Sequence, residues 1–275
     1  MVKRTLAGVV LVLITLAFFL LRTVHYKLFD LYVYVIGIIS TYELLKAFKD
    51  GVSKTQKVLV FVFTLLLYPV LSFYRNYVIH FVVGYISLTI FVSVLTTKLE
   101  EKDGLFKTIF ACFYPTLPLS SMILLNINDN GALFLLILVL AISSFTDVFA
   151  YLVGSAIKGP KLCEDLSPKK TISGAVGGLV GGILASLITY FALSAFEINV
   201  FGMANKLNVI IFLIASGAFL SAVSQVGDLV ESYIKRRLNV KDMGKIIPGH
   251  GGMLDRVDSL TFTSLFTFII YSLII

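Results

Sequence analysis

Charged residues are scarce in this chain: aspartate, glutamate, lysine and arginine together make up 14% of its 275 residues. Hydrophobic residues make up 58%, and the mean hydropathy is +0.95. An ordinary soluble domain carries about 25% charged residues and about 45–50% apolar residues. This composition therefore excludes a typical soluble protein and predicts an integral membrane protein.

The motifs of several enzyme classes are also missing. The chain has no G-x-x-x-x-G-K-[ST] phosphate loop, no strand-linked G-x-G-x-x-G, no H-E-x-x-H and no serine-nucleophile elbow. Its two cysteines, Cys112 and Cys163, have neither the spacing of a metal site nor a reason to be oxidised. A nucleotide, if one binds, must therefore be held by polar loops at the membrane edge.

What the sequence does contain is a series of long apolar segments. A helix that spans a membrane needs about 17–25 mainly apolar residues. Nine segments qualify: residues 5–21, 28–45, 58–74, 77–97, 105–126, 131–153, 174–196, 207–229 and 259–275. Transmembrane barrels have short alternating segments instead. We therefore predict an all-α polytopic membrane protein, a bundle of about nine transmembrane helices, with a kink at Pro115 and Pro118.

The lysines and arginines are distributed unevenly between the connecting loops. Nineteen of the 23 lie before the first segment or in the loops at residues 46–57, 98–107, 154–173 and 231–256. The positive-inside rule places these loops and the N-terminus in the cytoplasm and the C-terminus outside. No small-x-small cleavage site follows the first segment, so we expect it to be retained. This distribution explains most of the net charge of +7 without a nucleic-acid partner.

Polar residues also separate two regions of the chain. Within residues 1–130 they are few, so we interpret this part as a transmembrane scaffold. Glu43, near the end of the second segment, is interpreted as an interfacial residue beside Lys46. Residues 131–275 are interpreted as the catalytic region, with its two large cytoplasmic loops.

Four aspartates lie within a few residues of the predicted cytoplasmic ends of spans: Asp147, Asp228, Asp255 and Asp258. Ionisable residues at membrane depth are costly and are functional candidates. Asp255 and Asp258 are three residues apart, so they share one face if their helix begins this early. Neighbouring carboxylates repel one another, and a divalent cation relieves this repulsion. Because oxygen ligands favour magnesium, we predict a magnesium site here.

The two large loops add cations and a glycine-rich turn. Their basic residues include Lys158, Lys161, Lys169, Lys170, Lys235, Arg236, Arg237, Lys241 and Lys245. The turn at residues 248–252 contains His250 among three glycines, and its backbone N–H groups suit an anion. Metal and cations together neutralise the charge that develops on phosphate oxygens. The pattern therefore predicts phosphoryl or nucleotidyl transfer.

Small residues recur at the start of the seventh segment. Gly174, Gly178 and Gly182 are spaced four apart, and Gly177 and Gly181 form a neighbouring ridge. Small residues at this spacing let membrane helices approach closely. We predict that this segment packs tightly, within the protomer or across a dimer.

Two blocks of residues resemble the signature motifs of the CDP-diacylglycerol synthase (phosphatidate cytidylyltransferase) family. The first consists of Ser232, Lys235, Arg236, Lys241, Asp242, Gly244, Pro248, His250, Gly251, Gly252, Asp255, Arg256 and Asp258. The second consists of Asp147, Tyr151, Gly154, Ser167, Pro168, Lys169, Lys170, Thr171 and Gly174. The resemblance covers about residues 145–178 and 228–259. One departure is Ser173, where many members carry glutamate or glutamine.

This resemblance implies an activity and a set of partners. The family forms CDP-diacylglycerol and pyrophosphate from CTP and phosphatidic acid, requires Mg²⁺, and leaves room for a second cation such as K⁺. It is associated with a dimeric helical membrane fold, so a homodimer in the inner (plasma) membrane, with its active site facing the cytoplasm, is expected.

The motifs and the resemblance together predict site residues. Those predicted to be catalytic are Asp228, Lys235, Arg236, Lys241, Asp242, His250, Asp255, Arg256 and Asp258. Those predicted to bind substrate are Asp147, Tyr151, Ser167, Lys169, Lys170, Thr171, Ser232, Gly251 and Gly252. Asp228, Asp255 and Asp258 are predicted to hold the metal.

Three other functions are alternatives to this one. A CTP-dependent polyprenol or lipid kinase needs a similar metal and phosphate clamp and differs only in its products. A cation transporter predicts carboxylates near the bilayer midplane rather than at one edge, and paired interrupted helices that are absent here. CDP-alcohol phosphotransferases carry a D-G-x-x-A-R motif with further aspartates that this chain lacks.

Overall fold

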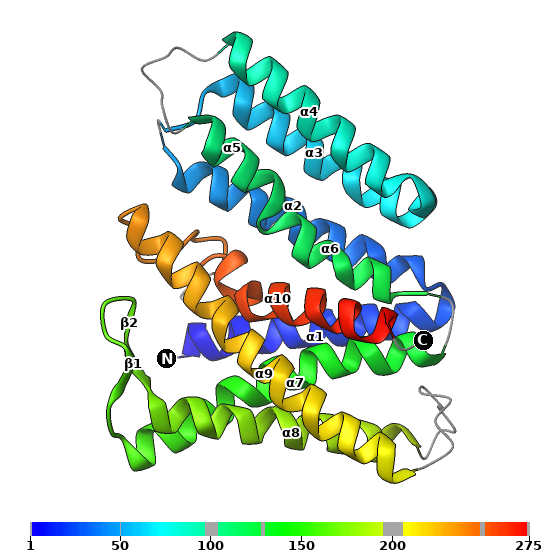
Figure 1. The fold of residues 1–275 in the computed structure, drawn as a ribbon, viewed down its shortest axis with the longest axis vertical. Coiled ribbons are helices and arrows are strands. Elements are labelled where there is room, and N and C mark those ends of the chain that lie inside the picture. Colours follow the sequence, from blue (N-terminus) through cyan, green and yellow to red (C-terminus); the bar gives the residue numbers. More distant parts are fainter. Residues whose placement is uncertain are drawn as a thin grey trace. The chain divides into compact units, whose positions relative to one another are not determined.

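A computed structural model describes residues 2–49, 51–96, 104–127, 130–194, 206–247 and 251–273 (Figure 1). The chain forms two compact units. The first comprises Met1–Leu124 and Leu238–Val257, and the second comprises Leu125–Arg237 and Asp258–Ile275. Residues 238–257, here called the signature loop, thus belong to the first unit, although they follow most of the second unit in sequence.

The first unit is built from helices that follow one another along the chain. They are α1 (Val2–Val24), α2 (Lys27–Ala47), α3 (Lys54–Phe73), the 3₁₀ helix η1 (Arg75–Tyr77), α4 (Val78–Thr96), α5 (Gly104–Phe113) and α6 (Thr116–Leu125). The predicted kink is confirmed as a break between α5 and α6, because Pro115 lies between the two helices. A capping box of Ser53 and Gln56 begins α3.

The second unit contains long helices and one hairpin. Its elements are α7 (Asn130–Ile157), β1 (Lys161–Cys163), β2 (Ser167–Thr171), α8 (Ile172–Ser194), α9 (Lys206–Arg237) and most of α10 (Leu254–Ser272). The strands β1 and β2 pair antiparallel, with Lys161 opposite Thr171. Helix α8 packs against both α7 and α9.

Eight helices in the described ranges are long and apolar enough to cross a membrane. They correspond to the first eight predicted segments, with α5 and α6 together forming one span. The predicted all-α polytopic fold is therefore confirmed, with the small hairpin as an addition. The ninth predicted segment forms α10, which is not among the eight. Three of its first five residues are charged: Asp255, Arg256 and Asp258.

Hydroxyl groups join the helices inside each unit. In the first unit, the buried hydroxyls of Thr41 (α2), Thr64 (α3) and Thr116 (α6) lie 3.1 to 3.3 Å apart. In the second unit, Thr146 of α7 donates to Ser221 of α9, which donates to a carbonyl of α8, each at 2.8 Å. Such hydrogen bonds hold helices together where the surroundings are as apolar as the helices themselves.

The glycine ridge on α8 packs against another helix of the same protomer. This was one of the two predicted alternatives, the other being packing across a dimer. A Cβ atom at Gly182 would lie 2.7 Å from the Gly217 carbonyl oxygen and 2.4 Å from the Ser221 Cβ, both on α9. Real Cβ atoms do not approach so closely, so only glycine fits between these helices.

Replacing Gly182 with alanine is therefore expected to destabilise the protein by about 1–3 kcal/mol, the usual cost of overpacking. Gly84 of α4 is a matched control, because a Cβ there would meet no atom within 4 Å. Alanine is the better helix former, so Gly84→Ala should leave stability unchanged or raise it. Thermal unfolding in detergent measures both. Equal unfolding temperatures for the two variants would contradict the close contact between α8 and α9.

Helix α9 of the second unit is longer than a bilayer requires. At about 1.5 Å per residue, the 32 residues of α9 extend about 48 Å, whereas the hydrocarbon core is about 30 Å thick. Its last ten residues contain Asp228, Glu231 and three basic residues. The apolar part of α9 thus leaves a polar end free to carry functional groups.

Candidate active site

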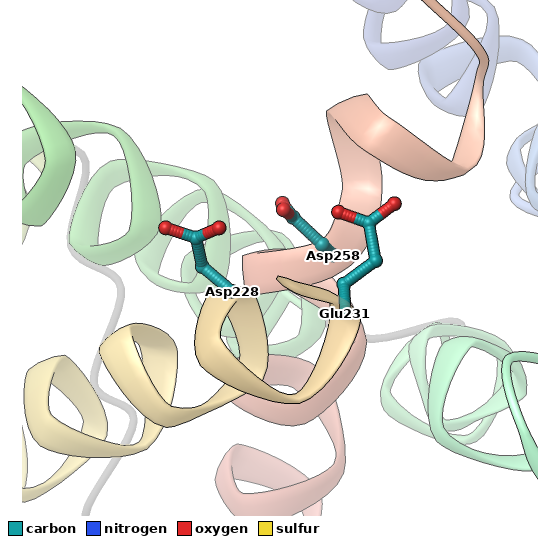
Figure 2. A group of neighbouring side chains, drawn as sticks. All are labelled: Asp228, Glu231 and Asp258. Carbon is teal, nitrogen blue, oxygen red and sulfur yellow. The ribbon is translucent and has the colours of Figure 1, made fainter. Parts of the chain in front are cut away.

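Three carboxylates of the second unit form a cluster. Asp228 and Glu231 lie on α9, and Asp258 lies near the start of α10. One ligand oxygen from each side chain lies within 4.8 Å of the others. Figure 2 shows the three side chains directed to the same side, two from α9 and one from α10. Asp228 and Glu231 share a helix face because they are three residues apart.

Two lysines partly neutralise this cluster. Lys170 of β2 forms an ion pair with Asp228, and Lys235 pairs with Glu231 at 2.7 Å. The Glu231 side chain is completely buried, whereas that of Asp228 is 28% exposed. The two lysines thus pair with Asp228 and Glu231, respectively.

Burial and the neighbouring carboxylates change the pKa of Asp258. This residue precedes the apolar part of α10 and lies outside the eight spans. Burial raises the pKa of this carboxyl well above its ordinary value, and the negative charges of Glu231 and Asp228 raise it further. Oxygen ligands at this spacing suit a hard divalent cation, which would relieve the repulsion. The cluster thus fits the predicted kind of metal site.

A cavity of about 380 Å³ lies beside Asp228 in the same unit. It is lined by Asp147, Ala150, Tyr151, Gly154, Ser155, Leu162, Lys169, Lys170, Thr171, Gly174, Ala175, Gln225 and Asp228. Five of the residues predicted to bind substrate therefore line one cavity: Asp147, Tyr151, Lys169, Lys170 and Thr171. Because Asp228 belongs both to the lining and to the acidic cluster, the cavity and the cluster adjoin.

The hairpin that carries the lysines is fixed at both ends. The Thr171 hydroxyl accepts a hydrogen bond from the Gly174 N–H at 3.1 Å, which caps the start of α8. Ser173, the residue that departs from the family pattern, donates to the Lys158 carbonyl oxygen at the other end of the hairpin. Arg236 of α9 donates to the Leu166 carbonyl oxygen at 3.4 Å, next to Ser167. The last contact ties the turn before β2 to the end of α9.

Most of the remaining predicted residues lie in the signature loop of the first unit. Asp255 accepts hydrogen bonds at Oδ2 from the backbone N–H groups of Met243 and Gly252, at 3.0 and 2.8 Å. This carboxylate therefore ties two parts of the loop together. Gly251 has a positive φ of 90° and pairs with Ile247 in an isolated bridge.

Lys241 and Asp242 are exposed, as is Arg256. The first two line a second cavity, of about 450 Å³, together with Lys46, Lys49 and Lys245. Ser232 is half-buried on α9. His250, with Pro248 and Gly249, lies outside the described residues.

Two residues at or near the cluster, Glu231 and Gln225, are not among the site residues predicted from the sequence. Glu231 completes the acidic group, and its spacing of three from Asp228 on a predicted helix was an available signal. Gln225 lines the cavity and donates to the Ala175 carbonyl oxygen at 3.2 Å. It is three residues before Asp228 and so shares its face.

Comparison with known proteins identifies relatives of this chain. The model of the cytidylyltransferase family matches residues 2–274. A phosphatidate cytidylyltransferase of Rickettsia conorii is 40% identical over 154 residues, which are 56% of this chain and 64% of the relative. One of Rickettsia bellii is 38% identical over 158 residues, 57% of the chain and 65% of the relative. One of Brucella abortus is 39% identical over 153 residues, which are 54% of this chain and 50% of the relative.

The matches thus span less than two thirds of the relatives' length. The family model, by contrast, covers almost the whole chain, and the resemblance found in the motifs is confirmed. The protein belongs to the cytidylyltransferase family.

Proposed function

We propose that this protein transfers the cytidylyl group of CTP to phosphatidic acid, giving CDP-diacylglycerol and pyrophosphate. The observation that carries the proposal is the sharing of Asp228 between the acidic cluster and the lysine-bearing cavity. A cation site and a phosphate site therefore adjoin in one compact unit. Relatives named phosphatidate cytidylyltransferase support the same reaction.

The surroundings of the cavity support a lipid as the second substrate. Tyr151, in its lining, is 73% exposed. Next to it along α7, Val148 and Leu152 are 53% and 54% exposed. On α8, Val176 is 56% exposed, beside the lining residue Ala175. In a membrane such apolar side chains contact lipid, so acyl chains can remain in the bilayer while the phosphate enters the cavity.

The reaction requires positioning and charge neutralisation more than proton transfer. A phosphate oxygen of phosphatidic acid is anionic at neutral pH, so no strong general base is needed. This oxygen forms a bond to the α-phosphorus of CTP, and the bond from that phosphorus to the oxygen bridging to the β-phosphate breaks. Pyrophosphate leaves. Lys169 and Lys170 are placed to bind phosphate oxygens and to hold the reactants in line.

Asp228, Glu231 and Asp258 are the residues that we propose to hold a divalent cation, with Mg²⁺ the expected ion. When bound, such a cation supplies positive charge that neutralises phosphate oxygens as the reaction proceeds. Lys170 and Lys235 keep two of the three carboxylates, Asp228 and Glu231, oriented through their ion pairs.

The distribution of basic residues supports an orientation in which this site faces the cytoplasm, in the inner (plasma) membrane. The resemblance to the family supports a homodimer, and K⁺ as a second cation. Sedimentation in detergent would test the dimer.

The purified protein in detergent, given phosphatidic acid and CTP labelled at the α-phosphate, is expected to form lipid-soluble label and pyrophosphate in equal amounts. Magnesium should be required, and EDTA should stop both products because it removes the cation from the carboxylates. Released CDP with unlabelled lipid phosphate would instead identify a CTP-dependent lipid kinase. Absence of turnover with any lipid acceptor would overturn the proposed function.

A further inference from the structure

Glu43 of α2 is buried in the first unit, with only 1% of its surface exposed. Its Oε2 accepts a hydrogen bond from the backbone N–H of Leu254 at 2.9 Å, and the Met253 N–H donates to the same carboxylate. The sequence suggested an interfacial residue beside Lys46. The structure instead places this carboxylate against the signature loop.

The hydrogen bond from Leu254 to Glu43 lies at the N-terminus of α10, where backbone N–H groups lack partners within the helix. Leu254 is the first residue of α10, and the first four N–H groups of a helix have no partner within the helix. A negative charge at this end also interacts favourably with the helix dipole. Since the capping group comes from α2, it fixes the start of α10 against α2 within the first unit.

Two glycines close around the same carboxylate. A Cβ atom at Gly244 would lie 2.0 Å from Oε1 of Glu43, and a Cβ at Gly252 would lie 2.4 Å from Oε2. Neither position has room for a side chain while Glu43 is in place. These glycines therefore provide the space that the carboxylate occupies.

Asp255 is a second carboxylate that holds the same loop. It accepts N–H groups from Met243 and Gly252, so the loop is held between two carboxylates, one on α2 and one on α10. Lys241 and Asp242 directly precede Met243, so this attachment sets the path of the signature residues beside it.

We infer that Glu43 is a positioning residue for the reaction: through Met253, Leu254 and the two glycines it holds the signature loop and the first turn of α10. This inference rests on the proposed function for its effect on turnover, but its structural part does not depend on the substrate. The region before residue 130 thereby contributes to the active state and is more than a scaffold.

Glu43→Gln tests this inference, because it keeps the size of the side chain and removes the charge. Hydrogen exchange measured by mass spectrometry should become faster for peptides covering residues 251–257. The kcat corrected for the folded fraction should fall by up to about 10²-fold, the cost of about 1 Å of misplacement. Asp30→Asn is the matched control, because Asp30 is a buried carboxylate of the same helix that accepts from the Ser72 hydroxyl at 3.0 Å. It should leave exchange at residues 251–257 unchanged.

A second pair of variants separates positioning from general stability. Gly244→Ala should disturb the loop in the wild-type background, where its Cβ meets Glu43, and should be better tolerated together with Glu43→Ala, which opens that space. Unchanged exchange at residues 251–257 in Glu43→Gln, or an equal effect of Gly244→Ala in both backgrounds, would overturn the inference. If the wild-type protein made no lipid product, the proposed function would fail while the exchange data still decided the role of Glu43.

Discussion

Asp258→Asn is expected to lower turnover by at least about 10²-fold while leaving the protein folded. The charge that a bound cation contributes to a phosphate reaction is worth several kcal/mol, and about 1.4 kcal/mol corresponds to a factor of ten. Asp258 is one of three carboxylates within 4.8 Å, so the neutral amide of asparagine would remove one of the three carboxylates that we propose to bind the cation. Its Oδ1 also accepts the Ser259 N–H at 2.7 Å, a contact that asparagine retains.

The matched control is Asp165→Asn, an exposed carboxylate in the turn between β1 and β2. It should turn over like the wild type. The measurement is the rate of α-label transfer across a magnesium titration, with thermal unfolding to establish folding. Near wild-type rates for Asp258→Asn at every magnesium concentration would remove this residue from the cation site.

The membrane helices were the most predictable part of the structure. A span is a local property of about twenty residues, because an isolated backbone in lipid must satisfy its own hydrogen bonds as a helix. The eight spans, the break at Pro115 and the packing of the α8 glycines follow from this local rule and from residue size. The hairpin β1–β2 was not predicted, since its strands have three and five residues and no alternating pattern.

The contacts of individual carboxylates were harder to predict. Glu43 and Leu254 are 211 residues apart, and no local pattern indicates that they meet. Glu231 was overlooked for a different reason: it stands at the beginning of a strongly basic stretch and reads as part of a solvated helix end. Its complete burial depends on how α9 packs, which only the structure provides.

Glu231→Gln and Asp255→Asn are expected to separate cation binding from loop support. The sequence predicted Asp255 as a ligand, whereas the acidic cluster contains Glu231 together with Asp228 and Asp258. Glu231→Gln should therefore weaken the binding of Mn²⁺, used as a probe for Mg²⁺, by roughly tenfold or more, on the scale of one lost charge interaction. Asp255 Oδ2 already accepts two backbone N–H groups, so Asp255→Asn should loosen the loop and leave Mn²⁺ affinity close to that of the wild type.

Electron paramagnetic resonance of Mn²⁺ measures this affinity without turnover, and the rise in unfolding temperature with Mg²⁺ provides an independent readout, because a ligand that binds only the folded state stabilises it. Glu164→Gln, an exposed residue of the same hairpin turn as Asp165, controls for the loss of one negative charge. Glu231→Gln also leaves Lys235 without its partner at 2.7 Å, so its stability in the absence of metal must be compared first. If Asp255→Asn weakened Mn²⁺ binding and Glu231→Gln did not, the ligand set predicted from the sequence would replace the one proposed from the cluster.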